Sequence, residues 1–325
     1  MKFAVVGAGA IGAYVGAALA RGGADVTLVA RGAHLAAMRE RGVTVKSARG
    51  DFHAHPAATD KMAEIGPVDV VLLALKAHQI APVVDEIRTL FGERTAVVAM
   101  QNGIPWWYFA KETGPYAGHV LQSVDPGGII SAAIEPDRVV GCVIYCSTEL
   151  EAPGVIHHTE GTRYSLGDPG GGVSERTTRI AEALVAGGLK APVEPDLRPE
   201  IWVKLLGNAA FNPISALTRA TLVEMCEDPG VENAARTMMR EAEAVANAVG
   251  VTLPFSIDRR IDGARRVGAH KTSMLQDLEA RKALELDAVT GAIVEIGKLV
   301  GVPTPATEQI YALTKLLERS VLEGR

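Results

Sequence analysis

Three polar side chains, spaced four residues apart, interrupt an otherwise apolar segment of the sequence: Lys204, Asn208 and Asn212. Residues four apart share one face of an α-helix, so the spacing predicts a narrow polar line on a helix that is apolar elsewhere. A helix that faced solvent would carry a broad polar arc. We therefore expect this line to face a ligand.

The residue types on this line suit acid–base chemistry. Burial disfavours an ammonium group, so it lowers the pKa of a buried lysine towards neutrality unless an acid pairs with it. Lys204 could then donate a proton to a carbonyl oxygen while a cofactor reduces the carbon. Asn208 and Asn212 can bind a carboxylate or a hydroxyl but cannot transfer protons. The alternative for Lys204 is an ordinary lysine whose ammonium reaches water.

A glycine-rich loop follows the first strand-like run and precedes a helical pattern. It consists of Gly7, Ala8, Gly9, Ala10, Ile11 and Gly12. This spacing in this context is typical of dinucleotide binding: Gly7 permits a tight turn, Gly9 admits a pyrophosphate, and Gly12 lets helix and strand pack closely. The helix N-terminus offers N–H donors to the phosphates. The alternative is a turn that binds nothing.

Three further residues lie after strand-like runs, where open α/β sheets bind ligands. Arg31 stands where NAD enzymes place an acid, and it can bind a 2'-phosphate, so the sequence favours NADPH over NADH. We expect Lys76 near the cofactor ribose or the substrate, and Asn102 near the nicotinamide or the substrate. The alternatives are a surface arginine and two ordinary turn residues.

A second polar line, again spaced by four, consists of Ser273, Asp277, Arg281 and Glu285. Alternating charges at this spacing are common on exposed helices, and we assign that role to Asp277 and Arg281. Ser273 and Glu285 have apolar neighbours, which favours a role in binding. The interpretation assumes one long helix at residues 272–300.

The first part of the chain alternates strand-like and helical patterns, which predicts a mainly parallel sheet covered by helices. We expect a helix at residues 78–90, an antiparallel extension of the sheet at residues 120–166, and a short strand at residues 191–194. After Pro195 and Pro199 the pattern is almost entirely helical.

The predicted fold class is therefore α/β: an N-terminal Rossmann-type, doubly wound sheet followed by an all-helical domain. We expect the domains to be residues 1–195, which would bind NADPH, and residues 196–325, which would bind substrate and carry the catalytic groups.

Composition excludes several other classes of function. The net charge of −5 gives no positive field for nucleic acid or an anionic membrane surface. The 3 cysteines, without zinc-site spacing, fit a reduced protein and no metal. Neither a signal peptide nor an apolar run of membrane-spanning length is evident. We expect a cytoplasmic protein that needs neither nucleic acid nor membrane.

Taken together, the chain resembles the ketopantoate reductase (2-dehydropantoate 2-reductase) family from Met1 to its last helix. The resemblance rests on the glycine loop with Arg31, on Leu75-Lys76 and Asn102-Gly103, on residues 200–213, and on Ser273-Met-Leu-Gln-Asp277 with Glu285.

The resemblance implies an activity and a set of roles. NADPH would reduce ketopantoate to pantoate, a step of pantothenate and coenzyme A biosynthesis, in a cleft between domains of a protein that often forms homodimers. Lys204 would be the general acid, and Glu285 would bind the substrate hydroxyl and help hold Lys204. The resemblance also implies the remaining roles. Asn208, Asn212 and Ser273 would bind substrate, and Lys76 and Asn102 would lie near the cofactor and the reacting centre.

Two departures from the family leave the substrate open. Asp125 could place a carboxylate near the pocket, and the run at residues 106–108 is unusually aromatic. One alternative is therefore an NADPH-dependent reductase of a different 2-oxo acid or ketone. A remote alternative is a non-catalytic NADPH sensor, which has no evident need for Lys204 and Glu285.

Overall fold

The computed structural model describes residues 1–324, which form two compact units. The first contains Met1–Gln101, Trp106–Val120 and Gly128–Leu197. The second contains the rest from Arg198 onwards, together with Asn102–Pro105 and Leu121–Gly127. The division into a cofactor-binding domain of residues 1–195 and a catalytic domain of residues 196–325 stays a prediction.

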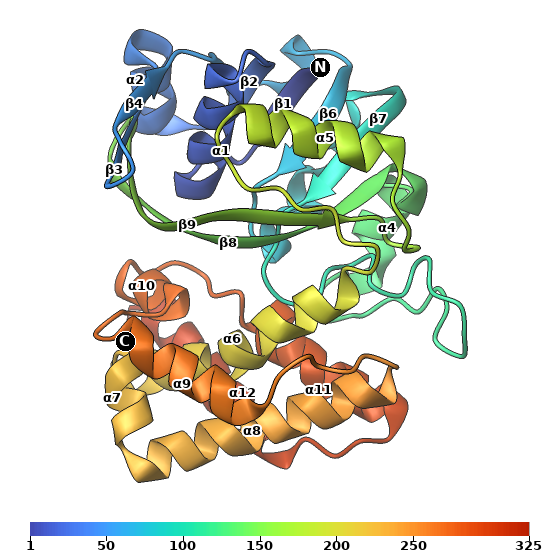
Figure 1. Ribbon diagram of the computed structural model, residues 1–325, viewed down its shortest axis with the longest axis vertical. Helices are drawn as coiled ribbons and strands as arrows, with labels where there is room; N and C mark the ends of the chain where they lie inside the picture. Colours follow the sequence, from blue (N-terminus) through green and yellow to red (C-terminus); the bar gives the residue numbers. More distant parts are fainter. Residues whose placement is uncertain (325) are drawn as a thin grey trace. The chain divides into compact units, whose positions relative to one another are not determined.

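A mixed sheet forms the first unit, and within the described residues its strand order is β4-β3-β9-β8-β7-β6-β1-β2-β5 (Figure 1). The strands are β1 Lys2–Val6, β2 Asp25–Val29, β3 Val43–Ser47, β4 Phe52–Ala54, β5 Ala57–Thr59, β6 Val68–Leu73, β7 Phe91–Ala99, β8 Val139–Ala152 and β9 Val155–Gly167. In this spatial order, every pair of neighbouring strands from β8 to β5 is parallel. Strands β8 and β9 pair antiparallel. This is the predicted Rossmann-type sheet with an antiparallel extension. The extension begins only at Val139, so its predicted start at residue 120 is wrong: residues 126–138 form short helical turns and a helix.

Helices cover this sheet. They are α1 Ala10–Arg21, α2 Gly32–Arg41, α3 Val84–Arg88, α4 Ile129–Ala133 and α5 Glu175–Ala186. Helix α1 is almost wholly buried, and it packs against β2, β8 and α5 (Figure 1). Its small side chains allow that close approach: a Cβ added to Gly16 would lie 2.3 Å from Leu28 Cδ2.

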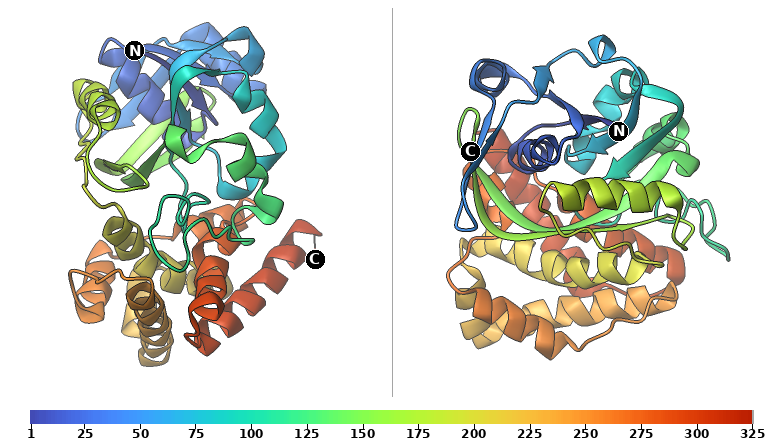
Figure 2. Two further views of the ribbon diagram at one scale, coloured as in Figure 1. Left: turned by 90° about the vertical axis from the view of Figure 1, so that its right-hand side faces the viewer. Right: turned by 45° about the horizontal axis from the view of Figure 1, so that its top comes forward.

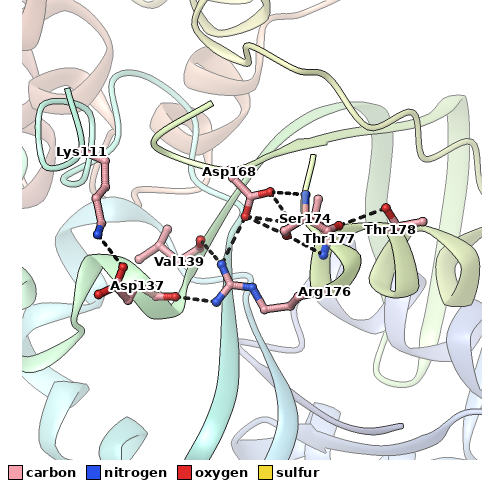
Figure 3. A network of polar contacts seen from close by, with 8 residues as sticks. All are labelled: Lys111, Asp137, Val139, Asp168, Ser174, Arg176, Thr177 and Thr178. Carbon is pink, nitrogen blue, oxygen red and sulfur yellow. Dashed lines mark hydrogen bonds and ion pairs between the residues drawn. The ribbon is translucent and has the colours of Figure 1, made fainter. Parts of the chain in front are cut away.

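Asp168 fixes the start of α5 (Figure 3). Its carboxylate accepts hydrogen bonds from the backbone N–H of Ser174 at 3.1 Å and from the Thr177 hydroxyl at 3.0 Å. Arg176 bonds the same carboxylate at 3.2 Å and also donates to the carbonyl of Val139, at the start of β8. A negative charge at a helix N-terminus is stabilising, so this network has a structural role.

The second unit is helical (Figure 2). Its helices are α6 Arg198–Thr218, α7 Leu222–Glu227, α8 Pro229–Ala248, α9 Ile257–Val267, α10 Ser273–Glu279, α11 Ala292–Val300 and α12 Pro305–Leu322. Helix α6, with thirteen of its residues buried, packs against α8, α10 and α12. The predicted polar line therefore runs along the most buried helix of this unit.

The long helix predicted at residues 272–300 is wrong. Arg281 has a φ of +53°, in the left-handed region, and the helix α10 ends before it. A π-helical turn, η6 (Asp287–Gly291), then leads into α11. The spacing from Ser273 to Glu285 is consequently not one helical face.

Two other local expectations are wrong where proline intervenes. Residues 78–90 form two 3₁₀ turns, η2 (Ala77–Gln79) and η3 (Ala81–Val83), and only then the helix α3. Pro82 lies in the second turn and disfavours a helical conformation in the residue before it. Residues 191–194 show an isolated bridge from Val193 to Leu166 instead of a strand, and Pro192 has no N–H to donate to a strand neighbour.

No helix in residues 1–324 is both long and apolar enough to cross a membrane. The same residues contain no group of three or more His, Cys, Asp or Glu side chains that could hold a metal ion.

Candidate functional site

The glycine loop has the geometry that its spacing predicts. Gly7 has a φ of +93°, and a Cβ there would lie 2.9 Å from the backbone nitrogen of Leu75. A Cβ on Gly12 would lie 2.3 Å from the carbonyl oxygen of Gly7. Any side chain at either position would force loop and helix apart, so both glycines are required for this turn.

Gly9 differs from its neighbours because it borders open space. It caps α1, and an added Cβ would meet nothing within 4 Å among the described residues. The first turn of α1 begins Ala10-Ile11, without an acidic side chain to oppose an anion. A phosphate group can therefore approach the N–H donors of this helix, and the loop fits a dinucleotide.

Backbone bonds hold Arg31 beside this loop. The N–H groups of Gly7 and Ala8 donate to the carbonyl of Val29, the last residue of β2, at 3.2 and 2.9 Å. Arg31 follows two residues later as the N-cap of α2, and its side chain is exposed. Within this unit its position suits a phosphate on the adenosine side of a dinucleotide.

Gln101 connects the ends of two neighbouring strands. Its side-chain amide donates to the carbonyls of Leu73 and Leu75 at 2.7 and 3.0 Å. Lys76 comes next and begins η2, where its backbone N–H donates to Gln79 at 3.1 Å. The sequence analysis did not assign Gln101 this positioning role, although its place shortly after the end of β7 was the available signal.

The polar line on α6 is joined to two residues that are distant in sequence. The ammonium of Lys204 donates to the side-chain oxygen of Asn102 at 2.7 Å. The amide nitrogen of Asn102 donates to the carboxylate of Glu285 at 2.9 Å. All three side chains are partly buried and belong to the second unit.

The order of donors and acceptors gives this row its chemistry. Asn102 presents its carbonyl to a cation and its amide to an anion, so one side chain satisfies both partners. An ammonium group carries three N–H donors, and that of Lys204 lies in a partly buried environment. Such a group can bind a carbonyl oxygen and give it a proton.

Close backbone packing fixes Asn102 opposite Glu285. Gly103 has a φ of +86°, and a Cβ there would lie 2.2 Å from the carbonyl oxygen of Ala288. The N–H of Ile104 donates to that same oxygen at 2.9 Å. The turn after β7 therefore rests directly on η6, and this contact needs a glycine.

The other residues expected to bind substrate lie in the same unit. Asn208 is partly buried, one turn along α6 from Lys204, and Asn212 is 7% exposed one turn further. Ser273 is exposed and is the first residue of α10. Their contacts with substrate stay a prediction.

The two departures that left the substrate open are buried. Asp125 is 0% exposed, so its carboxylate is not accessible to a ligand in this structure. Trp106, Trp107 and Tyr108 are at most 5% exposed. A Cβ on Gly141 would lie 2.6 Å from the Trp107 ring, so this aromatic run packs inside the first unit.

Two family models match this chain. Residues 3–171 match the family model described as ketopantoate reductase PanE/ApbA, and residues 196–318 match its C-terminal counterpart. The chain is 51% identical to the 2-dehydropantoate 2-reductase of Mesorhizobium japonicum over 98% of each protein.

Solved structures also resemble it. A crystal structure from Ralstonia solanacearum MolK2 has a TM-score of 0.93 and 39% identity, with 98% of each chain covered. The 2-dehydropantoate 2-reductase of Methylococcus capsulatus has a TM-score of 0.84 and 31% identity, over 99% of this chain and 98% of that one.

Proposed function

We propose that this chain, which belongs to the ketopantoate reductase family of oxidoreductases, reduces 2-dehydropantoate to pantoate with NADPH, in pantothenate biosynthesis. The observation that carries the proposal is the hydrogen-bonded row of Lys204, Asn102 and Glu285. It combines a proton donor, an amide that orients it and a carboxylate that balances its charge.

In this proposal Lys204 is the general acid. Its ammonium binds the carbonyl oxygen of the oxo acid and transfers one proton to it as the C=O bond becomes C–OH. Asn102 holds the ammonium in place, and Glu285 stabilises the positive charge and accepts a hydrogen bond from the substrate hydroxyl. Asn208, Asn212 and Ser273 bind the substrate carboxylate and hydroxyl.

The glycine loop supports a nicotinamide dinucleotide as cofactor, because Gly9 leaves the N-terminus of α1 open to phosphate. When bound, NADPH would supply the hydride that the carbonyl carbon accepts. Ala8, Ala10 and Ile11 belong to the same loop as Gly7 and Gly12 and would bind the cofactor with them. Arg31 would bind the 2'-phosphate. Lys76 would contact the cofactor from the end of β6.

Location and assembly complete the proposal. Among the described residues Cys142, Cys146 and Cys226 form no disulfide, which suits a reducing compartment, and we propose a cytoplasmic enzyme. The family's tendency to form dimers supports a homodimer. Besides the cofactor, the partner that we propose is a small-molecule 2-oxo acid, which is the substrate.

Replacing Lys204 with alanine tests the proton donor. We expect kcat with ketopantoate and NADPH to fall roughly 10²- to 10⁴-fold, the usual worth of a general acid. Lys298, whose side chain is 69% exposed, provides the matched control, and Lys298→Ala should keep normal turnover. Near-normal kcat in Lys204→Ala would assign the proton to another group.

The substrate is tested with the unmodified enzyme and a panel of 2-oxo acids and ketones, each with both nicotinamide cofactors. Ketopantoate should give the highest kcat/KM. A markedly higher kcat/KM for another carbonyl compound would favour the alternative reductase. Tight NADPH binding without turnover of any compound would favour the sensor.

A further inference from the structure

Glu285 lies in a segment that no regular helix holds. It precedes η6, after the chain has left α10 through the left-handed Arg281. The backbone carbonyl of Glu285 accepts a hydrogen bond from the N–H of Val289 at 3.0 Å, but Glu285 itself is not part of a helix. A carboxylate in such a segment stays in one place only if its flanking residues are anchored.

Helix α12 anchors the residue before Glu285. The N–H of Leu284 donates to the carboxylate of Glu318 at 2.7 Å. Glu318 is 8% exposed, and Lys315 lies 3.3 Å from it on the same helix. Because a buried N–H without an acceptor is unfavourable, this bond fixes the backbone next to Glu285.

The same helix anchors the second residue after Glu285. The hydroxyl of Tyr311 donates to one carboxylate oxygen of Asp287 at 2.6 Å, and the ammonium of Lys315 donates to the other at 2.7 Å. Burial, followed by the bond to Asp287, raises the pKa of Tyr311 above its usual range, so its hydroxyl stays a donor. A Cβ on Gly291 would lie 3.0 Å from the Tyr311 ring, which shows how closely η6 packs here.

We propose that α12 positions Glu285 for catalysis, through Glu318 on one side of it and through Tyr311 and Lys315 on the other. These three residues are positioning residues, because their hydrogen bonds are to Leu284 and Asp287, which flank Glu285. The inference rests on the proposed function, in which Glu285 supports the proton donor. It extends the functional machinery to a helix near the end of the chain.

Substitutions at Glu318 separate this role from a merely structural one. Glu318→Gln keeps an oxygen that accepts the Leu284 N–H, whereas Glu318→Met has a similar size and no such oxygen. A small displacement of a group near the reacting atoms can cost up to about 10²-fold in rate. We expect Glu318→Met to lower kcat at least roughly 10-fold, with NADPH affinity unchanged, and Glu318→Gln to restore most of it.

A double-mutant cycle with Glu285→Gln gives the decisive measurement. If α12 acts through Glu285, Glu318→Met should change kcat by less than about 2-fold once Glu285 is replaced, because coupled residues are not additive. Tyr311→Phe, which removes one oxygen atom, enters the same cycle if Glu318→Met does not fold. The control is Glu308→Gln on the same helix, where the Lys298 pair is exposed, and it should leave kcat unchanged.

Several outcomes would overturn the inference. Equal fold-losses in both backgrounds, or a Glu318→Gln variant as slow as Glu318→Met, would contradict positioning through Leu284 and Glu285. An active wild-type enzyme with such additive losses refutes the role of α12 alone. A wild-type enzyme that reduces no 2-oxo acid refutes the proposed function and this inference with it.

Discussion

Asn102 is the residue that connects the other two members of the candidate site. It receives a hydrogen bond from the ammonium of Lys204 and gives one to the carboxylate of Glu285. Neither Asp nor Leu can do both, because a carboxylate only accepts and an aliphatic side chain does neither. The sequence alone leaves two interpretations of Asn102: a residue that binds a ligand, or an ordinary residue of an Asn-Gly turn.

At the residue scale, His34 on α2 predicts a pH dependence of stability. Its Nδ1 accepts the N–H of Gly154 at 3.0 Å, and burial lowers its pKa below the ordinary 6.5. The unfolded chain therefore binds this proton more readily. The stabilising contribution of neutral His34 is complete above about pH 6.5 and is lost as the pH falls towards the folded pKa.

Thermal unfolding between pH 5 and pH 7 tests this contribution. His34→Asn keeps an acceptor oxygen near the position of Nδ1 but does not titrate. We expect the wild-type Tm to fall more steeply on acidification than the Tm of the variant. Parallel curves for the two proteins would rule His34 out as a source of the pH dependence.

Among the elements, η6 and the turn after β7 are mutually dependent. The turn needs a left-handed Gly103, and η6 presents the carbonyl of Ala288 to it at a distance that excludes any side chain. Periodicity predicted one continuous helix here, because the polar spacing of residues 273–285 matches a helical repeat. The helix α10 ends at Glu279 and is followed by the left-handed Arg281, and beyond it the N–H of Leu284 donates to Glu318 instead of to a helical carbonyl.

Gly103→Ala tests this packing. Left-handed strain alone costs about 1–3 kcal/mol in unfolding free energy, and the contact with the Ala288 backbone adds to it. We expect a lower Tm and a lower kcat, because Asn102 must move with its neighbour. Gly23→Ala is the matched control, since Gly23 has a φ of +87° and a Cβ there meets nothing within 4 Å among the described residues. Equal losses of kcat in both variants would show that strain, and not the contact, matters.

At the scale of the whole molecule, the rise in Tm that each nicotinamide cofactor causes should show which cofactor the protein prefers. A ligand that binds only the folded protein adds about 2.7 kcal/mol of stability at a concentration of 100 times its Kd. We expect NADPH to raise the Tm more than an equal concentration of NADH does. Arg31→Ala should remove most of that difference while keeping the smaller shift with NADH.

Calorimetric scans with each cofactor measure these shifts without any turnover. Arg39, whose side chain is 51% exposed on the same helix α2, offers the control variant Arg39→Ala. Equal losses of both shifts in Arg31→Ala would remove Arg31 from the 2'-phosphate site.

The sequence by itself determined the parts of this protein whose geometry is local. Glycine sterics set the loop from Gly7 to Gly12, the helical repeat set the line from Lys204 to Asn212, and alternating patterns set the Rossmann-type sheet. Each depends on residues within a few positions of one another, so spacing alone carries the information.

Only the tertiary structure decided which distant residues share a site. It assigned Asn102 to the helical unit, interrupted the helix before Glu285 and buried Asp125. These outcomes come from backbone contacts and hydrogen bonds between segments far apart in the chain, such as Gly103 against Ala288. Such contacts depend on how whole elements pack, and the spacing of residues within one segment does not encode them.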